Sequence, residues 1–177
     1  KFPVVIKPIN EGSSLGVRIC NNIKKLLGSA QFLFKKYNEL IFEEYIGGQE
    51  IQVAVINGNS LGAIELVPKR LFYDYKAKYT KKAKTKHLMP ARLSKKKNKE
   101  VLNIAKKAHH VLKCRGVSRS DFKFFNNIFY LLEINTQPGM TSLSLVPEIA
   151  KFKGVTFENL VEKILLDASV NKWKNVW

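Results

Sequence analysis

Short apolar runs bounded by turn-forming residues, together with longer segments of helical spacing, make up the hydrophobic pattern of the chain. Short apolar or alternating runs are typical of β-strands, whereas apolar residues recurring every three or four positions indicate amphipathic helices. The pattern predicts strands over residues 2–7, 17–20, 40–45, 50–56, 61–67, 121–125 and 129–135. It predicts helices over residues 24–37, 99–113 and 157–166. Because strands and helices are mixed along the chain, the fold class is α+β or α/β.

Turn residues divide some of these strands into hairpins. Asn57-Gly58, between two predicted strands, is a strong hairpin signal. A second hairpin is predicted where residues 121–125 are followed by residues 129–135. Residues 72–90 are polar and lysine-rich without a clear period. A loop of that length inside a compact domain is usually functional or mobile.

Asp121, Glu133 and Asn135 are candidate metal ligands. Glu133 and Asn135 lie two positions apart on one predicted strand, so their side chains share a face of the sheet. All three side chains offer hard oxygen donors, and no His or Cys is near them, which favours Mg²⁺ or Mn²⁺ over zinc. Two carboxylates and an amide leave room for the phosphates and water that often complete a magnesium site. Taken alone, the same residues are equally well explained as a polar patch on a solvent-facing strand.

The register of the second hairpin decides whether Asp121 can join the other two ligands. A two-residue turn at residues 126–127 would pair Asp121 with Leu132 and leave Glu133 on the opposite face. A three-residue loop at residues 126–128 would pair Asp121 with Glu133 instead. Three-residue loops are the next most common hairpin connection, and we expect one here.

Candidate phosphate and nucleotide contacts lie nearer the start of the chain. Residues 11–16 read Glu-Gly-Ser-Ser-Leu-Gly after a strand, and glycines with hydroxyls suit backbone N–H contacts to phosphate. The loop lacks the ending of a Walker motif, and an ordinary tight turn explains it as well. Lys7 precedes the loop and is either a phosphate contact or an exposed lysine at a strand end. Residues 43–46, followed by Glu50, offer a strand edge and carboxylates to an adenosine.

Composition adds a strong positive charge, which is compatible with several kinds of anionic partner. The chain has 177 residues, is 45% hydrophobic and carries a formal net charge of +17. Its lysines are scattered and arginines are few, which favours a solvated lysine-rich surface over a nucleic-acid interface. Cys20 and Cys114 match no metal or redox spacing and fit a reducing, cytoplasmic compartment. No apolar run is long enough to span a bilayer, so no membrane association is expected. The chain enters a strand almost directly after Lys1, and we expect it to be part of a longer protein.

Several motifs, in the same order, resemble those of the D-alanine–D-alanine ligase family within the ATP-grasp superfamily. The similarity extends from residue 2 to about residue 168 and covers the family's carboxy-terminal part. The matching stretches are VIKP (5–8), EGSSLGV (11–17), FEEYIGGQE (42–50), FYDYKAKY (72–79), CRGVSRSD (114–121), LLEINTQPGMT (131–141) and SLVP (144–147). The resemblance implies an α+β, ATP-grasp fold of mixed and antiparallel sheets with flanking helices. It also implies the end of the central subdomain at residues 1–42, the carboxy-terminal subdomain at 43–168 and a tail at 169–177.

The resemblance also implies roles for particular residues. ATP is expected to contact Lys7, Glu43, Glu44, Tyr45, Ile46, Glu50, Phe72 and Lys78. Mg²⁺ or Mn²⁺ is expected on Asp121, Glu133 and Asn135, and the second D-alanine on Ser144 and Leu145. Ser13 and Tyr79 resemble a pair that closes the active site, and Arg119 with the Gly139 backbone N–H resemble the groups that stabilise the tetrahedral oxyanion. The implied activity is ATP-dependent ligation of two D-alanines through an acyl phosphate, for peptidoglycan precursor synthesis, in a protein whose full-length relatives usually dimerise.

Departures from the family pattern accompany these matches. Lys123 stands where the family usually has an apolar residue near the base, Leu143 replaces a usual histidine, and Gln137 replaces a small or apolar residue. The family's amino-terminal lobe, which holds the first D-alanine, has no counterpart in this sequence. The main alternative is therefore a truncated, non-catalytic remnant that binds nucleotide. An ATP-grasp ligase with another acceptor and a basic nucleic-acid binder are weaker alternatives.

Overall fold

A computed structural model describes residues 1–12, 14–68, 85–141 and 143–168. The chain divides into two compact units, one formed by Lys1–Gly48 with Val67–Lys86 and the other by Gln49–Leu66 with His87–Trp177. Each unit combines an antiparallel sheet with one or more helices, which confirms the expected α+β class. The two units are described separately below.

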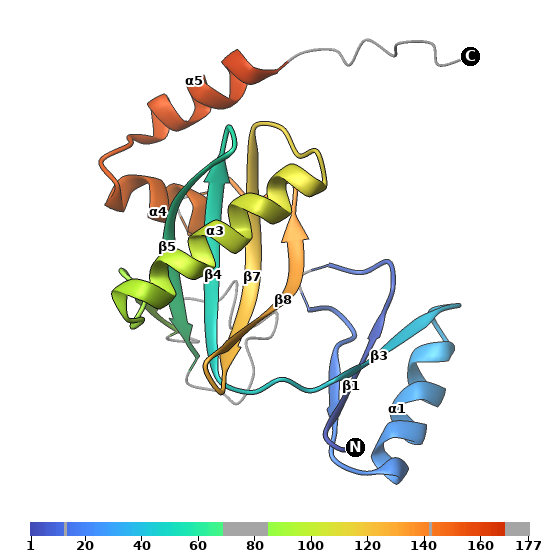
Figure 1. Ribbon diagram of the computed structural model, residues 1–177. Coiled ribbons are helices and arrows are strands. Elements are labelled where there is room, and N and C mark those ends of the chain that lie inside the picture. Colours follow the sequence, from blue (N-terminus) through green and yellow to red (C-terminus); the bar gives the residue numbers. More distant parts are fainter. Residues whose placement is uncertain (13, 69–84, 142, 169–177) are drawn as a thin grey trace, which may run out of the picture. The chain divides into compact units, whose positions relative to one another are not determined.

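The smaller unit is a three-stranded antiparallel sheet with one helix beside it (Figure 1). Its elements are β1 (Val4–Pro8), β2 (Arg18–Cys20), α1 (Ile23–Phe34) and β3 (Leu40–Glu44), and the strand order is β2-β1-β3. The N-cap residue Asn22 accepts a hydrogen bond from the Lys25 N–H at 2.9 Å, which explains why α1 begins there. Ile6, Cys20 and Leu33 form its buried core.

The larger unit is built on a five-stranded sheet of order β6-β5-β4-β7-β8. Its strands are β4 (Gln49–Ile56), β5 (Asn59–Val67), β6 (Lys86–Leu88), β7 (Val117–Phe125) and β8 (Ile128–Asn135). Its helices are α3 (Lys95–Val111), α4 (Leu145–Phe152) and α5 (Phe157–Asp167). The predicted hairpin at Asn57-Gly58 is present, and both residues have positive φ, 46° and 72°. Those values are typical of a two-residue turn that matches the twist of its strands.

Helix α3 lies across one face of this sheet (Figure 1). The side chains of Ile51, Val53 and Phe122 point to that face and pack against Val101 and Ala105 of α3. Successive residues of a strand point to opposite faces. The residues that alternate with this core, including Asp121, therefore lie on the face away from α3.

Helix α4 covers part of the face away from α3. A side chain at Gly62 of β5 would meet the Ile149 side chain at 3.4 Å, while the next residue, Ala63, belongs to the core under α3. Neither α4 nor β6 was predicted from the hydrophobic pattern. With 8 and 3 residues, both elements are too short to show a clear period.

A buried histidine connects α3 to β7. His109 is 2% exposed, and its Nδ1 lies 2.7 Å from the Ser118 hydroxyl. Burial lowers the pKa of His109 below its usual range, and the neighbouring His110 lowers it further, while Asp167 opposes the shift. His109 is therefore neutral in the folded protein under conditions in which an unfolded chain would already bind a proton.

Replacing His109 with glutamine is expected to reduce the dependence of the unfolding free energy on pH below neutrality. In the wild type, the unfolded chain takes up a proton at this histidine near pH 6.5 while the folded chain does not. The contribution of His109 to the unfolding free energy is therefore fully present above that pH. It is lost as the pH drops toward the lowered pKa of the folded state. The amide of His109→Gln does not titrate, so urea unfolding free energies measured between about pH 7.5 and 5.5 should vary less.

The matched control is His110→Gln, which changes an exposed histidine of the same helix. It should keep most of the pH dependence because burial of His109 is the larger cause of the shift. If the unfolding free energy depended equally on pH in the wild type and in His109→Gln, the lowered pKa of His109 would be contradicted.

Candidate functional site

The β7–β8 hairpin has a two-residue turn, so the predicted three-residue loop is wrong. Phe125 pairs with Ile128, and Asn126 and Asn127 between them have φ of 47° and 64°. Asparagine tolerates this left-handed conformation better than most residues, which favours the tight turn. The odd residue is instead Leu132, which has no partner in β7 and forms a β-bulge.

The bulge produces the pairing that was expected from a longer loop. Asp121 lies opposite Glu133, and Arg119 lies opposite Asn135. Residues directly opposite on neighbouring strands have Cβ atoms about 4.5–5.5 Å apart. The two carboxylates and the amide therefore share one region of the sheet face that points away from α3.

This region belongs to a larger polar face of the sheet. We call the polar face the set of charged and amide residues on β4, β7 and β8 that point away from α3. These residues are Glu50, Gln52, Arg119, Asp121, Lys123, Glu133 and Asn135. Glu50 pairs with Lys123 and Gln52 pairs with Asp121 across β4 and β7. The candidate metal ligands and the candidate ribose contact Glu50 thus share one face of one unit.

Asp121 is held by a bidentate ion pair. Its Oδ1 accepts a hydrogen bond from Arg119 Nε at 2.7 Å, and its Oδ2 accepts one from Arg119 Nη2 at 2.9 Å. Asp121 is 6% exposed, so the pair is largely removed from water. A planar guanidinium facing both oxygens fixes the orientation of the carboxylate. To reach a metal ion, Asp121 would have to share at least one of these oxygens.

Glu133 and Asn135 are more accessible. Glu133 is exposed, and within the described residues its carboxylate has no hydrogen-bond or ion-pair partner. The Asn135 Oδ1 accepts the Gln137 N–H at 2.9 Å, which places the side chain at the start of the following loop. No three His, Cys, Asp or Glu side chains cluster in the described part of the chain. The donor set is thus two carboxylates and one amide, and it fits an oxygen-preferring ion that takes its other ligands from phosphate or water.

Gln52 was not identified from the sequence. It is 2% exposed, and its Oε1 accepts no hydrogen bond from the described residues. It lies opposite Asp121 in the β4–β7 ladder. Buried amides normally have hydrogen-bond partners, so an unsatisfied acceptor at this position is unusual. The available signal was the alternation of Glu50 and Gln52 in an otherwise apolar strand.

The loop after β8 brings Gly139 and Ser144 together. A Cβ atom at Gly139 would lie 2.8 Å from the Ser144 hydroxyl, so only glycine fits without a shift. Ser144 is the N-cap residue of α4, yet its hydroxyl accepts the Thr141 N–H at 3.0 Å instead of capping the helix. Leu145 is buried, so its side chain belongs to the core. The backbone N–H groups at the start of α4 remain as possible contacts for a carboxylate.

The smaller unit holds the other nucleotide candidates. Lys7 on β1 forms an ion pair with Glu43 on β3, with Nζ and Oε2 at 2.8 Å. Glu44 is the last residue of β3, and the Tyr45 N–H donates to the Pro3 carbonyl at 3.2 Å. Ile46 follows and is half-buried.

The glycine-containing loop after β1 has one glycine with a clear packing requirement. Gly16 has a φ of 73°, and a Cβ atom there would lie 2.8 Å from Pro8 Cγ. At Gly12 no described residue lies within 4 Å of the equivalent position. The loop therefore needs Gly16 for its own turn, whereas the described residues set no such requirement at Gly12.

Four predicted site residues cannot be placed. Ser13, Phe72, Lys78 and Tyr79 lie outside the described residues.

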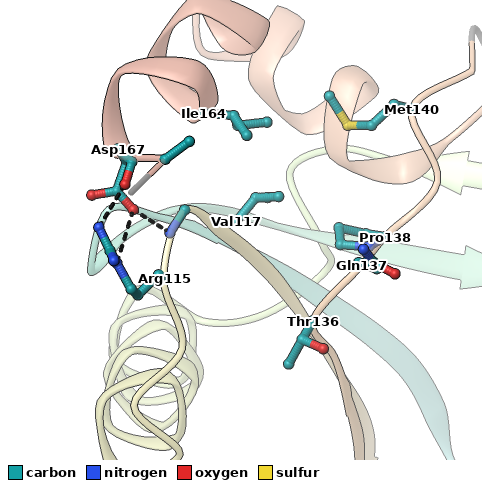
Figure 2. A pocket seen from close by; sticks show the side chains of 10 residues that line it. Arg115, Val117, Thr136, Gln137, Pro138, Met140, Ile164 and Asp167 are labelled. Carbon is teal, nitrogen blue, oxygen red and sulfur yellow. Dashed lines mark hydrogen bonds and ion pairs between the residues drawn. The ribbon is translucent and has the colours of Figure 1, made fainter. Parts of the chain in front are cut away.

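A separate pocket of about 650 Å³ lies between the start of β7, the loop after β8 and the end of α5 (Figure 2). The Asp167 carboxylate accepts the Gly116 N–H at 2.6 Å and pairs with Arg115, so α5 is fastened to the segment before β7. Among its described lining residues are Gln137 and Met140 but none of the predicted metal ligands. The pocket is adjacent to the loop that carries Gly139 and is not the candidate metal site.

Replacing Arg119 with methionine is expected to destabilise the larger unit. The change leaves the largely buried Asp121 carboxylate without its bidentate partner, and a hydrogen bond to a charged group typically contributes about 1.5–3 kcal/mol. Urea unfolding without divalent ions should show a loss of that size. In a double-mutant cycle, Asp121→Asn should cost less in the Arg119→Met background than in the wild type. Additive losses would mean that the ion pair does not orient Asp121.

The chain is similar to known proteins over nearly its whole length. Residues 1–166 match the family model described as "D-ala D-ala ligase C-terminus". A D-alanine–D-alanine ligase from Pelagibacter ubique (strain HTCC1062) is 62% identical over 97% of the chain. The D-alanine–D-alanine ligase from Bacillus anthracis has a TM-score of 0.81 at 32% identity and covers 94% of the chain, and its complex with ATP has a TM-score of 0.78 at 30% identity over the same share.

The chain spans about half the length of these relatives: 56% of the Pelagibacter protein and 54% and 53% of the two Bacillus structures. The ATP-grasp fold expected from the sequence motifs is confirmed by the structural matches. The chain belongs to the D-alanine–D-alanine ligase family, and it corresponds to the carboxy-terminal part of that family's members.

Proposed function

We propose that the chain provides the metal-binding, nucleotide-binding and acceptor-binding residues of an enzyme that joins two D-alanines at the expense of ATP. The observation that carries this proposal is the pairing of Asp121 with Glu133 on the polar face, with Arg119 and Asn135 beside them. The named activity of the relatives supports the reaction type. Two free thiols, Cys20 and Cys114, are compatible with action in the cytoplasm.

The residues that would hold Mg²⁺ or Mn²⁺ are Asp121, Glu133 and Asn135. Glu133 has no competing partner among the described residues, so it is the ligand most readily available. Asp121 is already oriented by Arg119, which reduces the side-chain freedom lost on binding. When bound, the ion would neutralise negative charge on the phosphate oxygens.

Each unit contributes its own candidate contacts to ATP. In the smaller unit, the Lys7 ammonium is a candidate for phosphate, and Glu43, Glu44, Tyr45 and Ile46 are candidates for the base. In the larger unit, Glu50 is the candidate for the ribose hydroxyls. Phe72 and Lys78 complete the proposed nucleotide contacts. Ser13 and Tyr79 are the pair proposed to close the active site.

The acceptor side of the reaction is proposed for the loop before α4. The γ-phosphoryl group of ATP would pass to the carboxylate of the first D-alanine, and the amine of the second would then displace phosphate to give the dipeptide. Arg119 and the Gly139 N–H are candidates to stabilise the oxyanion of that step. Ser144 and the N–H of Leu145 are candidates to bind the carboxylate of the second D-alanine, because α4 begins without a side-chain cap.

A nucleotide-binding protein without ligase activity is the second candidate. Both candidates require Mg–ATP binding, and only the first requires turnover.

Replacing Glu133 with alanine is expected to weaken Mg–ATP binding. Loss of even an outer-shell partner typically lowers metal affinity about 10- to 100-fold, so loss of a ligand should cost at least about tenfold. Isothermal titration calorimetry of the intact chain with ATP in excess Mg²⁺ measures the effect. Glu162→Ala, which removes an exposed glutamate of α5, is the matched control and should bind like the wild type.

Phosphate release with D-alanine then separates the two candidate functions. Release that depends on both ATP and D-alanine supports the ligase, whereas binding without release supports the nucleotide-binding alternative. Unchanged affinity in Glu133→Ala would refute the metal assignment.

A further inference from the structure

Lys123 forms an ion pair in the middle of the polar face. It lies opposite Glu50 across β4 and β7, and its Nζ donates to Glu50 Oε2 at 3.1 Å. Both side chains are 13% exposed. Lysine is rarely buried to this extent without a partner, because its ammonium group loses most of its hydration. The pair is therefore a specific feature of this face and not a mobile surface contact.

The pair uses only one oxygen of the carboxylate. Glu50 Oε2 accepts from Lys123, whereas Oε1 accepts no hydrogen bond from the described residues. Oε1 is also not among the fully buried side-chain atoms that lack a partner, so it keeps some exposure to solvent. Glu50 thus has one oxygen, Oε2, held by Lys123 and one, Oε1, that can still accept a hydrogen bond.

The ion pair with Glu50 accounts for a lysine at this position. An apolar side chain would fill the same place at lower desolvation cost. Asp121, the nearest other anion on β7, is already paired with Arg119. Among the described residues, the ion pair that Lys123 forms is the one with Glu50.

We propose that Lys123 is a specificity-determining residue for the nucleotide, because it fixes the Glu50 carboxylate so that Oε1 is directed to the ribose hydroxyls. This inference rests on the proposed function, in which Glu50 contacts the ribose of ATP. Without Lys123, the carboxylate would have to be ordered when the nucleotide binds, and part of its hydrogen-bond energy would be lost. Lys123 acts through Glu50 and is a positioning residue.

The test compares Mg–ATP with Mg–2′,3′-dideoxy-ATP on the intact chain by calorimetry. In the wild type, loss of hydroxyl donors to a charged acceptor should weaken binding roughly 10- to 100-fold. In Lys123→Met the ratio between the two nucleotides should fall roughly 2- to 10-fold, because the Glu50 carboxylate must then be ordered when the ribose hydroxyls bind. Lys123→Arg, which can still pair with Glu50, should keep most of the ratio. Lys106→Met, on the exposed side of α3, is the matched control and should keep all of it.

The ratio separates positioning from a purely structural role, because general damage weakens both nucleotides equally. An unchanged ratio in Lys123→Met, including one that results from an equal loss of affinity for both nucleotides, overturns the inference. A wild type that binds both nucleotides equally well also overturns it while leaving the proposed ATP binding intact. A wild type that binds neither overturns the proposed function and this inference with it. If Lys123→Met does not fold, Lys123→Val, which suits a strand but is too short to reach Glu50 and has no donor, is judged by the same ratio.

Discussion

Leu132 is the unpaired residue of the bulge in β8, and its position determines which side chains of the larger unit share a face. In a regular ladder from the Asn126-Asn127 turn, Leu132 would lie opposite Asp121, and Glu133 would point toward α3. That arrangement would place an unpaired carboxylate beside the fully buried Phe122. The bulge instead leaves Leu132 47% exposed. Exposing a leucine completely costs about 1.5–3 kcal/mol, whereas burying an isolated carboxylate costs far more, so the bulged register is the stable one.

Much of the fold could be predicted because local patterns agreed with tertiary structure. The Asn57-Gly58 turn and the strands on either side of it are a case in which turn chemistry and alternation give the same answer. The pairing of Asp121 with Glu133 was also predicted, although for the wrong reason. The prediction placed an extra residue in the loop, whereas the extra residue is Leu132 in β8. A sequence shows how many residues separate two ligands, but where a bulge forms depends on which face α3 covers.

Other features depend on tertiary contacts that no local pattern reveals. Gln52 looks like an ordinary polar residue of a strand, and only its burial opposite Asp121 makes it part of the polar face. The two-residue spacing of Arg119 and Asp121 places them on one face, but their bidentate geometry follows from the packing around them. Helix α4 is short, and Pro147 in its first turn interrupts neither its hydrogen bonds nor its start. Its proposed role of carrying Ser144 depends on its contact with the sheet, which no local pattern shows.

The charge of the polar face differs from that of the chain as a whole. The chain carries a formal net charge of +17, which raises the local concentration of any anion, including a nucleotide. On the polar face, Lys123 is paired with Glu50 and Arg119 is paired with Asp121. Glu133 is the carboxylate left over, so the face has one excess negative charge. A cation is therefore favoured at Glu133 even though the rest of the molecule repels cations. An anion that carries a bound divalent cation suits both the positive charge of the chain and the negative charge at Glu133. Mg–ATP is such a ligand.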